Sequence, residues 1–509
     1  MPTILLGESP LPLVTLVALS RPGARIGLSQ KVRAKIAKSR AVLTKGLGKG
    51  VALYGVNTGF GKLAGVRIPD EQLGQLQRNL LLSHATGVGE PLPQEQSRLA
   101  FALRIHNLAL GFSGVRIETL EQAMALWNGG YLPVIPAQGS VGASGDLAPL
   151  SHMALPLIGC GEVHAGDEVI TGAEALRRLG REPLELGCKD GLALVNGTQI
   201  MTAIGCLALH RAILLAKVAD IACAMTVEAL RGSEKPFQER LHELRPHAGQ
   251  QATAANLRAL LADSKIVPSH ANCTKVQDAY SLRCAPQVHG ASKDGIRYAL
   301  EVLVTEANSV TDNPLVFPDG DVVSGGNFHG QPVSQAMDFL KIAVSTLANI
   351  SERRTEQMVN PDISGLPPFL ARNPGLESGF MIAQVVAASL ASENKTLAHP
   401  ASVDTVPTSA NREDHVSMGV TAARHAGVVV ANTAKVLGIE VLCAAQALDL
   451  GEQLRPGVGV AAAVAAVRKR IAGLEGDRHL APDLAAAERL VLDGSLVEAV
   501  EQKAGVLAV

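Results

Sequence analysis

Long windows of helical apolar periodicity are the feature that most constrains how this 509-residue chain can fold. Proline is favoured in the first turn of a helix, so a helix is expected to begin near Pro332. Similar windows cover residues 201–231, 290–311, 379–397, 411–450 and 483–502. Windows of this length exceed an ordinary helix and predict a long helical bundle. The apolar residues that follow Pro332 at steps of three and four are Val333, Met337, Leu340, Val344, Leu347 and Ile350.

The first 200 residues follow a different pattern, because glycine and proline interrupt them often. For residues 1–200 we expect a domain of short helices, few strands and many loops, and for residues 201–509 the long-helix bundle with C-terminal helices. Residues 162–170 alternate around Gly166 and predict a small hairpin. The predicted fold class is therefore mainly α, with a loop-rich N-terminal domain.

Composition excludes several functional classes. The net charge is −1 and charged residues make up only 18%, which argues against nucleic acid or another polyanion as a partner. Seven cysteines without a Cys-x-x-Cys pair indicate reduced thiols in the cytoplasm, and the chain has no spacing typical of a metal site. The most apolar stretch, about 416–449, carries Arg424, Lys435 and Glu440, so we expect no membrane span.

The apolar composition also bears on assembly. Hydrophobic residues make up 47% of the chain but aromatic residues only 3%. Alanine, leucine and valine must therefore build the core, and such small aliphatic side chains allow helices to pack closely. Because so much of the chain is apolar, we expect contacts between subunits to bury apolar surface in addition to the core.

The segment 139–153 contains the motif that says most about function. At its centre, Ala143-Ser144-Gly145 could be converted into an electrophile, because glycine has no Cβ and its nitrogen can approach a nearby carbonyl closely. Attack of the Gly145 nitrogen on the Ala143 carbonyl, with loss of water, would close an imidazolone ring. Loss of the Ser144 hydroxyl as a second water would leave an exocyclic methylidene. No ordinary side chain is a good carbon electrophile, so such a ring could react with electron-rich groups such as amines.

Glycine-rich segments also have commoner explanations. Three glycines and two serines within residues 139–145 are typical of many loops. A glycine-rich turn can also bind phosphate, but here Asp146 would place a negative charge where the phosphate sits, and the lysine of a phosphate loop is absent. The tripeptide taken by itself leaves the plain loop open.

Together with other segments, this motif resembles the aromatic amino-acid ammonia-lyases, which carry a methylidene-imidazolone (MIO) made from Ala-Ser-Gly. The matching segments stand in that family's order and at about its spacing, and the resemblance extends from about residue 10 to residue 500. It is closest to the branch of the family that acts on histidine. Besides 139–153, the segments that carry the resemblance are Tyr54-Gly55-Val56-Asn57-Thr58-Gly59-Phe60-Gly61, Ser83-His84, Asn196-Gly197-Thr198-Gln199, and residues 277–284, 325–329 and 409–415.

The resemblance implies several properties of the chain as a whole. It implies a long helical bundle like that of fumarase and aspartase, and a homotetramer in which loops from several subunits complete each active site. The electrophile would form from Ala143, Ser144 and Gly145, so the resemblance implies neither a metal nor a diffusible cofactor.

The resemblance also assigns a base and an orienting group. Tyr54 is the candidate base for the β-proton, and a phenol in that role needs nearby positive charge or N–H donors. Asn196 would orient the electrophile by hydrogen bonds. Each residue has an alternative explanation, because Tyr54 could end a core strand and Asn196-Gly197 is a common turn signal.

Four further residues complete the implied substrate site. Arg283 would bind the substrate carboxylate through its planar fork, although many buried arginines simply pair with a protein carboxylate. Tyr280 lies three residues earlier and would share a helix face with Arg283. Gln277 and Phe328 are expected to line the pocket by the same resemblance. The family has proline where Ala279 stands, which puts the local backbone shape in doubt.

Two residues bear on the choice of substrate. An imidazole ring has a donor and an acceptor, and burying it requires polar partners. His84 and Glu413 would supply such partners, whereas the phenylalanine and tyrosine branches typically carry other residues at these positions. Glu413 could instead belong to a helix cap formed with Asn411 and Asp414.

Taken together, the residues predict elimination of ammonia from L-histidine to give trans-urocanate, the first step of histidine degradation. Four alternatives stay open: a phenylalanine or tyrosine ammonia-lyase, an aminomutase, a fumarase-type lyase without the MIO ring, and a helical scaffold without catalysis. The sequence does not choose between attack by the substrate's amine and attack by its ring.

Overall fold

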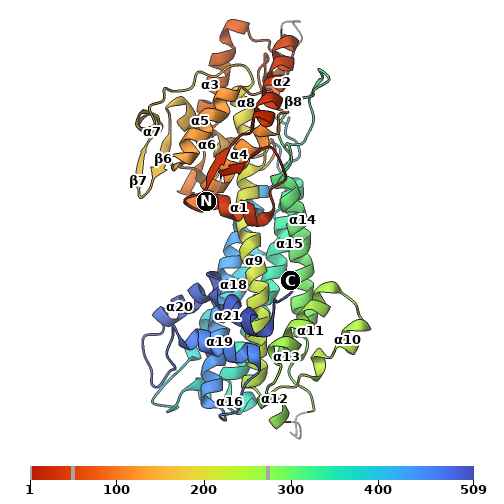
Figure 1. Ribbon diagram of the computed structural model, residues 1–509, viewed down its shortest axis with the longest axis vertical. Coiled ribbons are helices and arrows are strands. Elements are labelled where there is room, and N and C mark those ends of the chain that lie inside the picture. The colour runs from red at the N-terminus through yellow and green to blue at the C-terminus, as the bar shows by residue number, and fades with distance from the viewer. Residues whose placement is uncertain (1–2, 48–51, 271–275) are drawn as a thin grey trace. The chain divides into compact units, whose positions relative to one another are not determined.

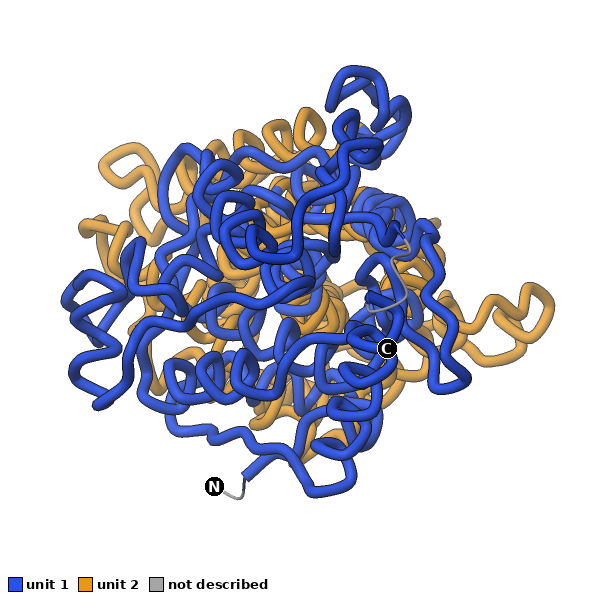
Figure 2. Tube along the Cα trace, turned by 90° about the horizontal axis from the view of Figure 1, so that it is seen from above, with its two compact units in different colours: residues 1–207, 300–338, 400–424 blue, residues 208–299, 339–399, 425–509 orange. Residues whose placement is uncertain are grey.

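The computed structural model describes residues 3–47, 52–270 and 276–509, and its fold is mainly α, as predicted (Figure 1). The chain divides into two compact units (Figure 2). Unit 1 contains residues 1–207, 300–338 and 400–424, and unit 2 contains residues 208–299, 339–399 and 425–509. We expected one boundary near residue 200. The segments 300–338 and 400–424 belong instead with the N-terminal part, because the chain returns to unit 1 between its long helices.

Unit 1 holds short helices and the small sheets. Its strands are β1 (Thr3–Leu5), β2 (Arg25–Gly27), β3 (Val88–Pro91), β4 (Tyr131–Pro133), β5 (Pro136–Gln138), β6 (Glu162–Ala165), β7 (Glu168–Thr171), β8 (Leu315–Val316) and β9 (Val322–Val323). They pair as β1-β2, β3-β5, β4-β6-β7 and β8-β9. Its helices are α1 (Leu13–Ser20), α2 (Gln30–Leu47), α3 (Leu73–His84), α4 (Gln94–Ala109), α5 (Ile117–Asn128), α6 (Leu147–Ala154), α7 (Gly172–Arg178), α8 (Asp190–Val195) and the 3₁₀ turns η1 (Gly61–Gly65), η2 (Asp70–Gln72) and η3 (Leu155–Ile158).

The predicted hairpin at 162–170 is confirmed as the antiparallel pair β6-β7. Ala165 pairs with Glu168, so a two-residue turn joins the strands. Gly166 in that turn has a φ of +71°, a conformation that favours glycine.

Four of the predicted windows coincide with long helices, and the division between the units falls inside each of these helices. They are α9 (Gln199–Ala229), α14 (Ala285–Ala307), α15 (Gln331–Val359) and α18 (Gly419–Leu450). The helix α15 begins one residue before Pro332, as the sequence predicts. The 18-residue window of α18 that is most apolar passes the length and composition test for a membrane span, but 83% of it is buried within the fold, as in the core helix of a globular protein.

Unit 2 holds the remaining helices. They are η4 (Lys235–Phe237), α10 (Glu239–Glu243), α11 (Ala248–Leu260), α12 (Ile266–Ser269), α13 (Tyr280–Arg283), α16 (Pro361–Ser364), η5 (Pro368–Leu370), α17 (Met381–Leu397), α19 (Val458–Arg468), α20 (Ala481–Leu492) and α21 (Ser495–Ala504). The window predicted over 483–502 is two helices, because Gly494 between them has a φ of +79°. The window over 411–450 also began too early, since Asn411 and Met418 have positive φ values of 65° and 55° that an α-helix excludes.

Candidate active site

The Ala143-Ser144-Gly145 tripeptide lies in unit 1, in the segment between β5 and α6. Gly145 has a φ of +69° and forms a β-bridge with Gly197. A Cβ on Gly145 would overlap the Gly197 carbonyl oxygen, so this position admits only glycine. The same carbonyl accepts a hydrogen bond from the Asp146 amide at 2.7 Å. The backbone around the tripeptide is therefore held tightly against the turn that follows α8.

Asp146 anchors the end of the tripeptide to the first turn of α9. Its buried carboxylate accepts hydrogen bonds from the amides of Ile200 at 2.9 Å and Met201 at 3.0 Å, and from the Ser140 hydroxyl at 3.2 Å. Burial raises the pKa of Asp146 to about 7, while these donors act in the opposite direction. Carboxylates at helix N-termini satisfy amides that have no partner within the helix, so this contact fixes the loop to a long helix.

Two side chains from distant segments contact the tripeptide directly. The Asn196 amide nitrogen donates to the Ser144 carbonyl oxygen at 3.3 Å, and its own Oδ1 is buried without a hydrogen-bond partner among the described residues. The Ser144 hydroxyl donates to Glu413 Oε1 at 2.8 Å, and the Thr408 hydroxyl donates to the other Glu413 oxygen at 2.6 Å. Glycine at position 145, the closely packed backbone and these polar partners fit the requirements of an MIO ring.

A cavity of about 520 Å³ opens beside Ser144. All of its lining residues belong to unit 1. Its polar lining includes Tyr54, His84, Asn196 and Glu413, so four of the eight side chains predicted to surround the electrophile share one cavity with it. Its apolar lining comes from Phe60, Leu63, Val66, Ile68, Leu76, Leu80, Leu147 and Leu192.

Tyr54 and His84 are positioned by short-range contacts. The Tyr54 hydroxyl accepts a hydrogen bond from the Gly61 amide at 3.2 Å, which supplies one of the N–H donors that a phenol needs in order to act as a base. The Ser83 hydroxyl lies 3.0 Å from His84 Nδ1. Burial lowers the pKa of His84, with the Leu80 backbone and Glu413 opposing the shift. A neutral imidazole has one donor and one acceptor nitrogen, and the Ser83 hydroxyl lies beside Nδ1.

The predicted catalytic residue Tyr280 and two predicted substrate-binding residues lie outside this cavity. Gln277, Tyr280 and Arg283 belong to unit 2, where the Arg283 guanidinium stacks over the Tyr280 ring at 4.5 Å and donates to Gln277 Oε1 at 2.8 Å. Tyr280 and Arg283 are both in α13, and Tyr280 is 71% exposed. Phe328 is half-buried in the loop between β9 and α15 and does not line the cavity either. None of these four residues lines the cavity of unit 1.

Other residues of the cavity were missed by sequence reasoning. Leu76 and Leu80 precede His84 at steps of four on α3, so helical spacing would have predicted a shared face. Thr408, which holds Glu413, comes just before the last motif, and the lining residue Ser409 is the first residue of that motif, to which no role was assigned. Their role depends on a turn whose shape the sequence pattern does not reveal.

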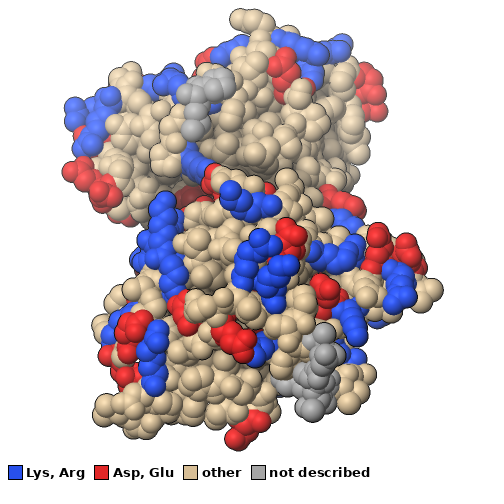
Figure 3. Space-filling model, turned by 60° about the horizontal axis from the view of Figure 1, so that its bottom comes forward, with Lys and Arg blue, Asp and Glu red and all other residues tan. Residues whose placement is uncertain are grey.

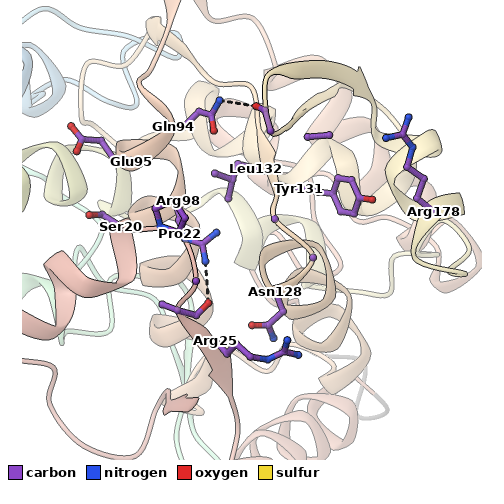
Figure 4. Close-up of a pocket in the computed structure, with 16 residues that line it drawn as sticks. Ser20, Pro22, Arg25, Gln94, Glu95, Arg98, Asn128, Tyr131, Leu132 and Arg178 are labelled. Atoms are coloured by element: carbon purple, nitrogen blue, oxygen red, sulfur yellow. Dashed lines mark hydrogen bonds between the residues drawn. The ribbon is translucent and has the colours of Figure 1, made fainter. Parts of the chain in front are cut away.

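A second cavity in unit 1, of about 650 Å³, is lined by arginines that pair with protein oxygen atoms (Figure 4). Arg98 lies in it and donates to the carbonyl oxygens of Arg21 at 3.0 Å and Ala24 at 3.1 Å. Arg178, at its edge, pairs with Glu174 at 2.8 Å. These arginines are occupied by carbonyls and a carboxylate, so we assign no reaction to this second cavity.

The chain belongs to the aromatic amino acid lyase family, whose sequence profile matches residues 11–469. Among individual relatives, it is 55% identical to the histidine ammonia-lyase of Gloeobacter violaceus over 96% of both chains. Its fold matches the crystal structure of histidine ammonia-lyase from Trypanosoma cruzi with a TM-score of 0.91, at 44% identity over 98% of this chain and 95% of that one. It also matches tyrosine aminomutase from Streptomyces globisporus with a TM-score of 0.93, at 37% identity over 99% of both chains.

Proposed function

We propose that this protein is a histidine ammonia-lyase that converts L-histidine into trans-urocanate and ammonia. The observation that carries the proposal is that His84 and Glu413 line the same cavity as the Ala143-Ser144-Gly145 tripeptide. A neutral imidazole and a carboxylate can match the donor and the acceptor of an imidazole substrate, whereas a purely apolar pocket would leave both without partners. The relatives named histidine ammonia-lyase support the same substrate.

The electrophile of this enzyme would be an MIO group formed from the tripeptide with loss of two waters. Such a group supplies an electrophilic carbon that makes elimination of ammonia feasible. Asn196 and the Gly197 backbone would hold it, through the contacts they already make with Ser144 and Gly145. Asp146, which directly follows the tripeptide, would anchor the MIO group to the first turn of α9.

The remaining side chains have distinct tasks in this proposal. Tyr54 takes the β-proton, and its hydroxyl is oriented by the Gly61 amide. Glu413 and His84 bind the substrate ring. Arg283 binds the carboxylate, and because the resemblance implies active sites shared between subunits, we propose that a second copy of the chain supplies it together with Gln277, Tyr280 and Phe328.

The proposed protein is a cytoplasmic homotetramer. The six cysteines among the described residues are all unpaired thiols, in keeping with a reducing compartment. Unit 2 exposes large apolar side chains on α15 and α17, which subunit contacts would cover. These side chains are Phe339, Ile342, Ile382 and Val385. On the face in Figure 3, basic and acidic side chains are mixed and neither sign forms a continuous surface, so this face offers no obvious site for a polyanion.

Adding L-histidine to the purified protein and following urocanate by ultraviolet absorbance tests the activity, with phenylalanine and tyrosine in parallel. Intact mass tests the ring, because mature protein should be lighter than its sequence by two waters. Turnover of phenylalanine or tyrosine without turnover of histidine would refute the proposed substrate. An amino-group shift to the β-carbon would indicate an aminomutase. An intact mass equal to that calculated from the sequence would refute formation of the ring.

A further inference from the structure

Arg104 is a buried charge that the proposed reaction does not use. It lies on α4 and is only 1% exposed. A buried guanidinium is unfavourable unless acceptors match its donors. Here the acceptors are the carbonyl oxygen of Ala193, the carbonyl oxygen of Asn196 at 3.0 Å, and Gln199 Oε1 at 2.7 Å. These acceptors lie on both sides of the turn that joins α8 to α9.

That turn is also the part of the chain that contacts the tripeptide. A Cβ on Gly197 would lie 2.6 Å from Arg104 Nη1, and a Cβ on Gly145 would overlap the Gly197 carbonyl oxygen. The Arg104 guanidinium therefore packs against Gly197, and Gly197 packs against Gly145, without room for a methyl group at either contact. From the same turn, Asn196 donates to the Ser144 carbonyl oxygen. Any shift of the turn would reach the tripeptide directly.

The chemistry of the turn favours arginine over other cations. The carbonyls of Ala193 and Asn196 come at the C-terminal end of α8, where a positive charge is stabilising. The planar guanidinium can donate to three separate acceptors at once, whereas a lysine side chain has a single nitrogen from which to donate. Burial lowers the pKa of Arg104 to about 10, with Asp312 and Asp146 opposing the shift, so the side chain is charged at neutral pH.

We propose that Arg104 is a positioning residue for the ammonia-lyase reaction, which fixes the turn of Asn196 and Gly197 behind the tripeptide. Closure of the ring and the later alignment of substrate would both depend on it, although Arg104 touches neither. This inference rests on the proposed function.

The test compares Arg104→Lys with Arg98→Lys. Arg98 is a matched control because it lies on the same helix, is 6% exposed, stacks on Trp127 and also donates to two main-chain carbonyls, neither of them in the Asn196 turn. Both variants should lower the melting temperature. Only Arg104→Lys should reduce the fraction of molecules that have lost two waters. It should also lower kcat per mature ring by about tenfold or more, with a smaller change in KM.

Two results would overturn the inference. In the first, Arg104→Lys has the same fraction of molecules lighter by two waters and the same kcat as the wild type. In the second, Arg98→Lys lowers that fraction and kcat as much as Arg104→Lys does. If Arg104→Lys does not fold, Gln199→Met removes one acceptor and leaves Arg104 in place. Gln199 is buried and also donates to Thr311, so this variant should lose some stability as well. A severalfold lower kcat per mature ring, measured well below its melting temperature, would support the inference, and a wild-type kcat would overturn it. The wild-type protein separates the two proposals, because failure of the proposed function would appear there first, as inactivity on histidine or a full sequence mass.

Discussion

At the scale of single residues, Ser144 has two contacts of different kinds. Its carbonyl oxygen accepts from Asn196, and its hydroxyl donates to Glu413. The first contact belongs to the backbone and survives any substitution of the side chain. The second disappears when the hydroxyl is removed, either by mutation or by the proposed loss of water. Substitution of the Ser144 side chain can therefore remove the hydroxyl needed for the proposed ring while the backbone contact with Asn196 is kept.

Ser144→Ala should fold and assemble like the wild type but lose nearly all activity. Relative to the unprocessed chain, the variant loses one hydrogen bond from a half-buried hydroxyl, which costs about 1 kcal/mol of the free energy of unfolding, and the mature wild type lacks the same hydroxyl. It also lacks the oxygen whose loss would create the methylidene. Thermal unfolding and the urocanate assay check the two parts, and turnover of histidine at the wild-type rate would show that the mechanism is wrong.

Glu413→Gln should separate ring formation from substrate selection. Glutamine keeps the size of the side chain and one acceptor oxygen for the Ser144 hydroxyl, so the two-water loss should persist. It removes the negative charge proposed to bind the imidazole, and histidine turnover should fall by about a hundredfold or more. Intact mass and steady-state kinetics measure the two effects. Histidine kinetics equal to the wild type would remove Glu413 from the proposed site.

At the scale of secondary structure, α4 shows how one buried helix connects separate parts of unit 1. His106 on this helix is 1% exposed, and its Nδ1 accepts a hydrogen bond from the Gly7 amide, just after β1, at 3.1 Å. The ring must be neutral to accept that bond. Burial lowers the pKa of His106 to about 4, with Asn308 opposing the shift.

This shift predicts an acid-sensitive contribution to stability. The pKa of His106 in the folded state lies below its unfolded value of 6.5, so its contribution is fully present above pH 6.5 and is lost as the pH falls towards 4. The whole loss amounts to about 3 kcal/mol at 1.4 kcal/mol per pKa unit. His106→Asn keeps an acceptor but does not titrate, so its unfolding midpoint should depend less on pH between 7 and 5 than that of the wild type. Parallel pH profiles would exclude His106 as the cause.

The same scale shows what periodicity can and cannot predict. The helices α9, α14, α15 and α17 were predicted because their apolar residues repeat over many turns. The beginning of α18 was misplaced because it depends on the φ values of Asn411 and Met418, and residues other than glycine give little signal for such a conformation. Glu413 lies between these two residues, so the sequence named it as a site residue but the turn that presents it was visible only in the structure.

At the scale of the whole molecule, the residues predicted for the active site are divided between the two compact units. The three-residue spacing predicted that Tyr280 and Arg283 would share a helix face, and the structure places both on α13 with their side chains in contact. The spacing could not show that they lie in a different compact unit from Ser144. A sequence records which residues a site needs but not how many chains supply them.

Mixed tetramers test the proposal that subunits share active sites. Ser144→Ala and Arg283→Met should each be inactive by themselves. If Ser144 and Arg283 of one site come from different chains, co-expression of the two variants creates some sites in which both residues are wild type. With random assembly this holds for about a quarter of the sites, so about a quarter of the wild-type activity should return.

The control replaces Arg283→Met with the double variant Ser144→Ala, Arg283→Met. Co-expressed with Ser144→Ala, it offers no intact Ser144, so no activity should return. If the first pair forms mixed tetramers, shown by native mass measurement, yet stays inactive, then each site takes Ser144 and Arg283 from the same chain. That result would refute the proposal that subunits share active sites.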